Sequence, residues 1–316
     1  MQMSKLSIII PVYFNEMNLH DLYEDIKSKV LNQLDTYELV FVDDGSKDSS
    51  YEVMLELQKM DSNIRCIRLS RNFGSHAAIL AGLNECTGDC AVMKTADLQE
   101  PSEILLEMFE SWKSGFNVVL AVRSDRNESL LQKFFSNSYY KLMRRFVLKE
   151  MPLGGFDCFL IDRKVIEVLR LMDEKNTSLM GQILWSGFKT NSIYYTRLKR
   201  EKGKSRWTLS KKIKLVIDSV LSFTHLPIRV MSVVGLTFFM ISIIWSSVIV
   251  YLKLFGEIQL EGWTTLMVFN LFSSGLILLT LGIIGEYLWR NFDATRNRPV
   301  YIVEQRNYSE SKPKSE

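Results

Sequence analysis

The first 125 residues alternate between short apolar runs and amphipathic segments. Five runs carry β-forming residues bounded by turn residues, which predicts strands at Leu6–Val12, Tyr37–Val42, Ile64–Leu69, Asp89–Met93 and Asn117–Val122. Helical patterns fall between them, at about residues 18–33, 48–60, 76–86 and 101–114. Regular alternation of strand and helix predicts an α/β fold with a mostly parallel sheet covered on both faces.

Two much longer apolar runs, Val230–Tyr251 and Thr264–Leu288, follow nearer the C-terminus. At about 1.5 Å per helical residue, each covers the roughly 30 Å hydrocarbon core of a bilayer. They are nearly free of charge, whereas Lys253, Glu257 and Glu261 stand between them. The pattern predicts a two-helix transmembrane hairpin; the alternative is a helical hairpin buried in a large soluble core.

Basic residues flank the two runs on their outer sides. Arg290, Arg296 and Arg298 follow the second run, and a denser group precedes the first: Arg197, Lys199, Arg200, Lys202, Lys204, Arg206, Lys211, Lys212 and Lys214. By the positive-inside rule, both termini face the cytoplasm and the short connection faces out. The apolar run near the N-terminus is too short for a signal peptide, which agrees with a cytosolic N-terminal domain.

A further amphipathic segment precedes the first long run. Apolar residues recur there at helical spacing, from Leu209 to Leu221, with lysines elsewhere on the helical wheel. This pattern predicts a helix lying on an anionic membrane surface, or alternatively a helix packed on the globular domain. The expected organisation is a globular domain at 1–207, an interfacial helix at 208–228, the membrane hairpin at 229–289 and a cytosolic tail at 290–316.

Polar and charged residues cluster directly after the predicted strands. Ligands of open parallel sheets bind beyond the carboxyl ends of the strands, so these residues are candidates for binding. Carboxylates, amides and arginines recur at all five positions, as a polar ligand that carries phosphates would require. The segments are Pro11–Glu16, Asp43–Ser46, Ser70–Gly74, Lys94–Gln99 and Arg123.

Other classes of site are disfavoured by spacing. The four cysteines form no CxxC pair and the three histidines are scattered, which favours buried reduced thiols over a zinc site or a disulfide framework. Gly203-Lys204-Ser205 is similar to the end of a P-loop, but that motif requires glycine where Leu198 stands. No GxGxxG follows the first strand, so dinucleotide binding is also disfavoured.

Taken in order, these strand-end segments resemble the family 2 glycosyltransferases of the polyprenyl-phosphate sugar transferase group, relatives of dolichol-phosphate mannose synthase and bactoprenol glucosyltransferases. The resemblance covers about residues 5–305. It is carried by the paired apolar runs and by six stretches: Ile8–Glu16, Phe41–Ser46, Leu69–Gly74, Ala96–Pro101, Gly155–Asp157 and Gly203–Trp207. The resemblance implies a GT-A fold that binds a nucleotide sugar, with UDP or GDP as its nucleotide.

The resemblance also implies roles for individual residues. Pro11, Tyr13 and Glu16 would line the base and ribose pocket, and Asp43 or Asp44 would accept hydrogen bonds from the base. Arg71 would lie near the diphosphate. Guanidinium groups bind phosphate through a fork of donors. The resemblance implies that Arg123 is a catalytic residue that holds the transferring or the acceptor phosphate in this way. Lys204, Ser205 and Arg206 match a flexible basic loop that closes near the phosphates in relatives, and they are the further candidates for the acceptor phosphate.

In the family, an Asp-x-Asp motif followed by Leu-Gln holds a divalent ion against the diphosphate. Here Thr95 replaces the first acid, leaving Asp97 and Gln99 as candidate ligands of Mg²⁺ or Mn²⁺. Asp97 would then be catalytic through the ion, which neutralises charge on the departing nucleotide. Three alternatives follow: Asp97, Gln99 and the diphosphate suffice, Lys94 supplies part of the countercharge, or the protein binds without turnover.

The expected activity is an inverting transfer of a hexose from a UDP- or GDP-sugar to polyprenyl (undecaprenyl) phosphate. A phosphate acceptor needs little proton removal, whereas a glycan hydroxyl would need a general base. Asp157 is the candidate for that base or for contact with sugar hydroxyls; the alternative is a structural acid in a turn. The expected location is a bacterial inner (plasma) membrane, as a multi-pass protein that does not bind nucleic acid; some relatives form tetramers.

Overall fold

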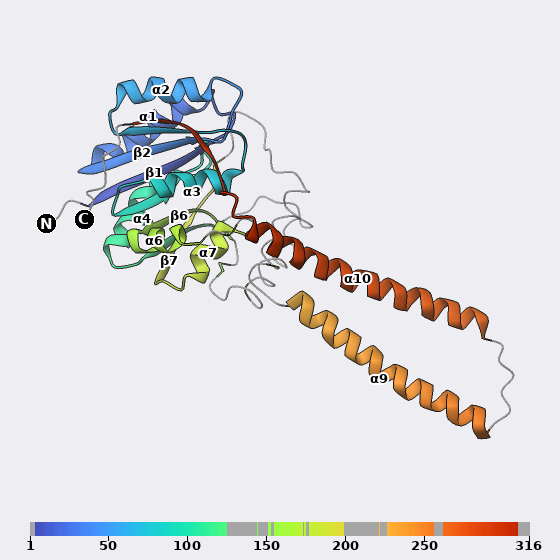
Figure 1. Cartoon of the computed structure of the whole chain (residues 1–316). Coiled ribbons are helices and arrows are strands. Elements are labelled where there is room, and N and C mark those ends of the chain that lie inside the picture. The colour runs from blue at the N-terminus through green and yellow to red at the C-terminus, as the bar shows by residue number, and fades with distance from the viewer. Residues whose placement is uncertain are drawn as a thin grey trace, which may run out of the picture. The chain divides into compact units, whose positions relative to one another are not determined.

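A computed structural model describes residues 4–124, 144, 151–152, 155–172, 174, 177–198, 221, 226–255 and 262–308 (Figure 1). The chain divides into two compact units, residues 1–216 with 299–316 and residues 217–298. Within the described part of the first unit, eight strands form one sheet in the order β7-β5-β6-β4-β1-β2-β3-β8. Their bounds are β1 Lys5–Val12, β2 Thr36–Asp43, β3 Ile64–Leu69, β4 Cys90–Met93, β5 Val118–Arg123, β6 Phe156–Asp162, β7 Thr190–Tyr195 and β8 Val303–Asn307.

The predicted parallel core is confirmed. β1 pairs in parallel with β2 and β4, β2 with β3, and β5 with β7. β6 runs antiparallel to β4 and β5, and β8 runs antiparallel to β3. The five predicted strands correspond to β1–β5, because their apolar runs are buried on both faces of the sheet. β6, β7 and β8 were not predicted.

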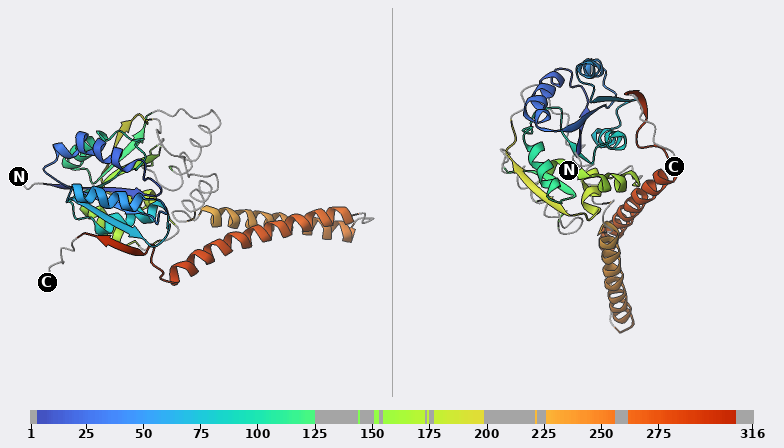
Figure 2. Two further views of the ribbon diagram at one scale, coloured as in Figure 1. Left: turned by 90° about the horizontal axis from the view of Figure 1, so that it is seen from above. Right: turned by 90° about the vertical axis from the view of Figure 1, so that its left-hand side faces the viewer.

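Helices cover both faces of this sheet (Figure 2). Leu6, Ile8 and Ile10 of β1 belong to one core with residues from one group of helices, which comprises α1 Leu19–Lys29, α2 Ser50–Met60 and α4 Ile104–Lys113. On the opposite face, a Cβ on Gly82 of α3 (Ser75–Glu85) would lie 2.4 Å from Ile9 Cγ2. Gly82 therefore lets α3 approach β1 closely. The remaining helices in the described part of this unit, apart from the isolated helical residue 144, are η1 Leu31–Gln33, α6 Arg163–Arg170 and α7 Leu179–Trp185.

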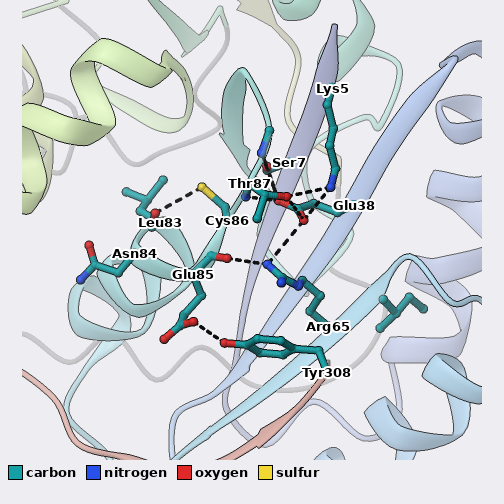
Figure 3. A network of polar contacts seen from close by, with 12 residues as sticks. Lys5, Ser7, Glu38, Arg65, Leu83, Asn84, Glu85, Cys86, Thr87 and Tyr308 are labelled. Atoms are coloured by element: carbon teal, nitrogen blue, oxygen red, sulfur yellow. Dashed lines mark hydrogen bonds and ion pairs between the residues drawn. The ribbon is translucent and has the colours of Figure 1, made fainter. Parts of the chain in front are cut away.

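Near the start of β2, a buried acid organises a polar network (Figure 3). Glu38 accepts hydrogen bonds from Ser7 Oγ at 2.6 Å, Thr87 Oγ1 at 2.8 Å and Lys5 Nζ at 3.1 Å. Arg65 adds a guanidinium 3.7 Å away. Burial alone would raise the pKa of Glu38, but the hydrogen bonds from Ser7 and Thr87 lower it on balance. This acid is held in its charged form by contacts within the protein.

The second unit contains α9, Leu226–Phe255, and α10, Trp263–Thr295. Both are long and apolar enough to cross a membrane, with windows at Pro227–Trp245 (mean hydropathy 2.0) and Phe272–Thr295 (1.4). They occupy the two predicted apolar runs and extend beyond them. The predicted interfacial helix at 208–228 falls almost wholly outside the described residues.

The C-terminal segment differs from the expected tail. Residues 299–316 belong to the first unit rather than forming a separate segment, and β8 adds a strand beside β3 (Figure 2). β8 has four exposed residues among its five, so its sequence carries no apolar alternation. Its pairing partner is more than 200 residues earlier in the chain, which explains why local pattern did not predict it.

Candidate active site

Asp43, the last residue of β2, is a buried carboxylate, and only one of its two oxygens accepts a hydrogen bond from the described residues. It lies between Val12 of β1 and Arg68 of β3 in the parallel ladder, and is fully buried. Its Oδ1 accepts a hydrogen bond from Ser46 N at 3.0 Å. Its Oδ2 is also buried and accepts no hydrogen bond from the described residues; Arg68 Nε lies 3.5 Å from it. Burial raises the pKa of Asp43, and an acceptor left in this state suits a ligand donor.

Asp44 is equally buried but bonds both of its oxygens to backbone. Oδ1 accepts from Phe73 N at 2.7 Å and Oδ2 from Gly74 N at 2.9 Å. Burial is the main cause that raises its pKa to about 6. Asp44 therefore shapes the loop at 70–74, whereas one buried oxygen of Asp43 has no hydrogen-bond donor among the described residues. The sequence left the choice between these two acids open.

The turn after Asp44 is packed tightly against the same loop. Gly45 has φ of 68°, and a Cβ there would lie 2.5 Å from the carbonyl carbon of Arg71. Only glycine combines that φ with so close an approach. Arg71 is exposed and lies over the Phe73 ring, 4.1 Å from its centroid. The predicted diphosphate residue thus stands beside the predicted base residues.

The segment after β1 is tied to the turn after β2. Asp44 N donates to Val12 O at 2.8 Å, and Phe14 N donates to Ser46 Oγ at 3.0 Å. Phe14 has φ of 55°, an unfavourable conformation for a bulky residue and one that is typical of functional loops. Tyr13 packs edge-on against Phe14, with ring centroids 4.7 Å apart. Tyr13, Asp43, Asp44 and Arg71 are therefore gathered in one region.

Two of the predicted pocket residues have further roles. Glu16 is exposed, and its Oε2 accepts a hydrogen bond from Ser49 N at 2.8 Å, at the start of α2. Pro11 is half-buried within β1 and pairs in register with Val42. Glu16 thus fixes the loop against α2, and its contact with a ribose stays a prediction.

Thr95 joins two acids after β4. Its Oγ1 contacts Asp97 Oδ1 at 2.8 Å and also bonds to Glu100 Oε2. The neighbouring Lys94 is fully buried, donates to the Glu100 carbonyl and lies 3.8 Å from Glu100 Oε2. Because Glu100 already pairs with this ammonium, the geometry gives no support to Lys94 as a countercharge for a diphosphate.

Gln99 is bound by the segment that follows β7. Leu198 N donates to Gln99 O at 2.9 Å, and Arg197 donates to the carboxamide oxygen Oε1. Arg123, the last residue of β5, is half-buried and pairs in register with Tyr195 of β7. The ends of β5 and β7 and the segment after β4 thus form a second polar region, in which Asp97, Gln99 and Arg123 lie.

Other predicted site residues cannot be placed in full. Asp157 belongs to β6, at the irregularity where that strand's register on β5 shifts, and its side chain lies outside the described ones. Lys204, Ser205 and Arg206 also lie outside the described residues. Their roles stay predictions.

A family sequence model described as glycosyl transferase family 2 matches residues 7–170, which contain all the strand-end segments after β1–β5. The chain belongs to glycosyltransferase family 2. An uncharacterized glycosyltransferase of Bacillus subtilis (strain 168), YkcC, is 38% identical over 300 residues, which are 95% of this chain and 93% of that protein. The expected fold and enzyme class are confirmed: this protein is a glycosyltransferase.

Relatives with more specific names match over similar lengths. A prophage bactoprenol glucosyl transferase homolog of Escherichia coli (strain K12) is 31% identical over 305 residues, 95% of this chain and 99% of that protein. Among solved structures, a mannosyltransferase of Pyrobaculum calidifontis in complex with GDP-Man and Mn²⁺ has 15% identity and a TM-score of 0.47; the match covers 63% of this chain and 57% of that chain.

Few side chains that could bind a divalent ion lie together in the described part of the glycosyltransferase. Among the described residues, no group of three or more His, Cys, Asp or Glu side chains could hold a metal ion. Asp97 and Gln99 offer one carboxylate and one amide oxygen, which are ligand types that magnesium takes together with phosphate and water, although Arg197 donates a hydrogen bond to that amide oxygen. An ion shared with a substrate therefore suits this site better than an ion caged by protein alone.

Sequence reasoning did not assign a positioning role to Ser46, Arg68 or Arg197. Ser46 links the turn after β2 to the segment after β1, and Arg197 holds Gln99. Arg68 donates to Ser46 O at 3.3 Å and flanks Asp43. Ser46 lies within the matched Asp-Asp-Gly-Ser motif and could have been found there, whereas Arg68 and Arg197 depend on neighbours distant in the chain.

Proposed function

We propose that this glycosyltransferase moves a hexose from a UDP- or GDP-sugar to a polyprenyl phosphate, such as undecaprenyl phosphate, with inversion at the anomeric carbon. Transfer takes place at the cytosolic face of a bacterial inner membrane. The observation that carries the donor half of the proposal is Asp43, whose buried Oδ2 accepts no hydrogen bond from the described residues. A nucleobase N–H would satisfy this oxygen.

The surrounding residues support binding of the rest of a nucleotide diphosphate. Tyr13 lies beside the Asp43–Ser46 turn and supplies an aromatic wall. Arg71 stands exposed on the loop that Asp44 orders, where its guanidinium would contact the diphosphate. Because both loops are already fixed by hydrogen bonds, donor binding would cost little ordering of the chain.

A divalent ion, Mg²⁺ or Mn²⁺, would be held by Asp97 and Gln99 together with the donor diphosphate. When bound, it supplies positive charge that stabilises the departing nucleoside diphosphate. Asp97 Oδ1 contacts Thr95, which keeps the carboxylate in place without a second acid. Gln99 would have to share its carboxamide oxygen with Arg197 or release it.

The acceptor half rests on the apolar helices and on the relatives. α9 and α10 would span the membrane and keep the protein beside its lipid substrate. A relative named bactoprenol glucosyl transferase, from Shigella phage SfII, is 31% identical over an alignment of 305 residues that covers 95% of this chain. Arg123, with Lys204, Ser205 and Arg206, would hold the acceptor phosphate, whose anionic oxygen attacks the anomeric carbon. Orientation and charge stabilisation then carry most of the rate enhancement.

The test is a transfer assay with the full-length protein in detergent. Polyprenyl phosphate is supplied with a panel of labelled UDP- and GDP-hexoses and with Mg²⁺ or Mn²⁺. The proposal predicts an organic-extractable, acid-labile labelled product that requires the lipid phosphate. Absence of product from every donor on the panel would contradict it.

The second candidate function uses a hydroxyl of a lipid-linked glycan as acceptor. Its support is Asp157, which the β6 irregularity places near the end of β5 and which could serve as a base. Replacing Asp157 with Asn distinguishes the two. Loss of nearly all turnover favours the hydroxyl acceptor, whereas retention of most turnover favours the phosphate.

A further inference from the structure

The strand that follows the second apolar helix reaches the donor region through one arginine. Arg68 lies on β3, and its guanidinium contacts groups on three sides: Ser46 O at 3.3 Å, the Tyr51 ring at 5.0 Å, and two carboxylates. The carboxylates are Asp43 Oδ2, 3.5 Å from Nε, and Glu304 Oε2, 3.7 Å from the same nitrogen. One N–H group thus lies between a site acid and an acid of the C-terminal strand.

A β-bulge brings Glu304 to this position. β8 pairs Gln305 with Arg68 and Val303 with Leu69, so Glu304 is the extra residue between two consecutive pairs. In a regular ladder, Gln305 would share the face of Arg68 and Glu304 would point to the other face. The bulge re-aims Glu304 toward Arg68, as bulges beside functional sites commonly do. Ser70 N donates to Ile302 O at 3.0 Å and fixes the strand just beyond the bulge.

The two carboxylates compete for Arg68. Nε has a single hydrogen and lies 3.5 Å from one acid and 3.7 Å from the other, so it forms an ion pair with both and donates a hydrogen bond to neither. Glu304 is half-exposed, so its pull on the guanidinium is modest. Without it, Nε would be free to close on Asp43 Oδ2, the oxygen that the proposed function reserves for the nucleobase.

We propose that Glu304 is a positioning residue for donor binding, which acts by holding Arg68 back from Asp43. The inference rests on the proposed function, in which Asp43 accepts a hydrogen bond from the base. It assigns the bulged strand β8 a role beyond covering the edge of the sheet: β8 keeps the base acceptor available.

The other end of β8 offers a matched control. Glu85 accepts a hydrogen bond from Arg306 Nε at 3.0 Å. It also accepts a hydrogen bond from Tyr308 (Figure 3). Arg65 also lies over the Tyr308 ring, 4.2 Å from its centroid. The substitution Glu85→Gln therefore weakens the attachment of β8 without touching Arg68, and it reports what loosening of the strand does by itself.

The experiment titrates full-length protein in detergent with UDP and with GDP, and measures KM for the donor and kcat for transfer. Glu304→Gln should raise the nucleotide Kd and the donor KM by roughly two- to fivefold, the size expected of an exposed ion pair, and leave kcat unchanged. Glu85→Gln should leave Kd unchanged. In an Arg68→Gln background, or in Arg68→Lys if that protein folds poorly, Glu304→Gln should have no further effect.

Several results would overturn the inference: wild-type affinity in Glu304→Gln, an equal loss in Glu85→Gln, or a Glu304→Gln effect that persists without Arg68. These outcomes differ from failure of the proposed function itself. If wild-type protein bound neither UDP nor GDP, the donor proposal would fail, and this inference with it.

Discussion

Two buried acids near opposite ends of β2 have opposite surroundings. Glu38 receives hydrogen bonds from Ser7, Thr87 and Lys5, and its pKa is lowered. Asp43 receives one bond from Ser46 N, keeps a buried oxygen without a donor among the described residues, and its pKa is raised by burial. Burial alone therefore does not mark a site acid. What distinguishes Asp43 is a carboxylate oxygen to which no described residue donates a hydrogen bond.

The largest expected effect comes from removing Glu38, the acid whose oxygens already accept hydrogen bonds from the protein. Glu38→Ala leaves a lysine, a serine and a threonine without their buried partner, and breaking such a pair costs about 3–5 kcal/mol. We expect a large fall in the thermal midpoint, with the Kd of UDP or GDP unchanged in the protein that remains folded. If Glu38→Ala lost as much nucleotide affinity as an Asp43 variant, the proposal that only Asp43 contacts the nucleotide would be wrong.

For Asp43→Asn we expect the reverse: nucleotide affinity falls, while thermal stability does not. The amide keeps the shape of the side chain but not its charge, and hydrogen bonds to charged groups contribute about 1.5–3 kcal/mol. We expect the Kd for UDP or GDP to rise roughly 10- to 100-fold, by isothermal titration. The thermal midpoint without ligand should stay the same or rise, because a poorly paired buried charge is removed. Wild-type affinity in this variant would exclude Asp43 as the base acceptor.

Asp44 is a third buried acid in this part of the molecule, and its raised pKa makes the stability of the fold depend on pH. Its pKa is raised to about 6, from an ordinary value of 3.8, so the folded protein holds the proton more tightly than the unfolded chain. The protonated acid therefore favours folding at low pH, and that contribution is lost as pH rises from about 4 to 6. The thermal midpoint of the wild type should fall relative to Asp44→Asn over this interval and run parallel above it. A constant difference would show that folding leaves the pKa of Asp44 unchanged, and the opposite slope would show that folding lowers it; either result contradicts the prediction.

The smallest effect is expected at Thr95. Thr95→Asp places a third carboxylate beside Asp97 and the buried Glu100, and like charges this close repel one another. We expect a slightly lower thermal midpoint without metal and a larger gain on adding Mn²⁺ than in the wild type. Thr95→Asn, similar in size but neutral, is the control. Equal metal responses in all three proteins would argue against an ion at Asp97.

The sequence predicted β1–β5 well, but it missed both edge strands, β7 and β8, and the interior strand β6. β1–β5 are short apolar runs, and burial on both faces leaves a signal that local pattern can show. β7 is half-exposed along most of its length and β8 is almost entirely exposed, so neither has such a signal. Both are held by pairing with strands distant in the chain, a cause that no local window contains.

The sequence likewise predicted some features of the candidate site and not others. Motifs at strand ends located Tyr13, Asp43, Asp44 and Arg71, and the structure brings these four together. Spacing could not separate Asp43 from Asp44, since adjacent acids differ only in which backbone groups meet them. Nor could it foresee that Lys94 is buried against Glu100 or that Glu304 approaches Arg68. The first contact depends on packing and the second on a β-bulge, and the spacing of residues along the chain shows neither.

The most direct test of the account locates the bound nucleotide by hydrogen–deuterium exchange of the full-length protein with and without UDP or GDP. The account predicts slower exchange at residues 12–16, 43–46 and 70–74, with little change around Lys5, Glu38 and Thr87. Protection concentrated near Glu38, or no protection at the three segments despite saturating nucleotide, would contradict it.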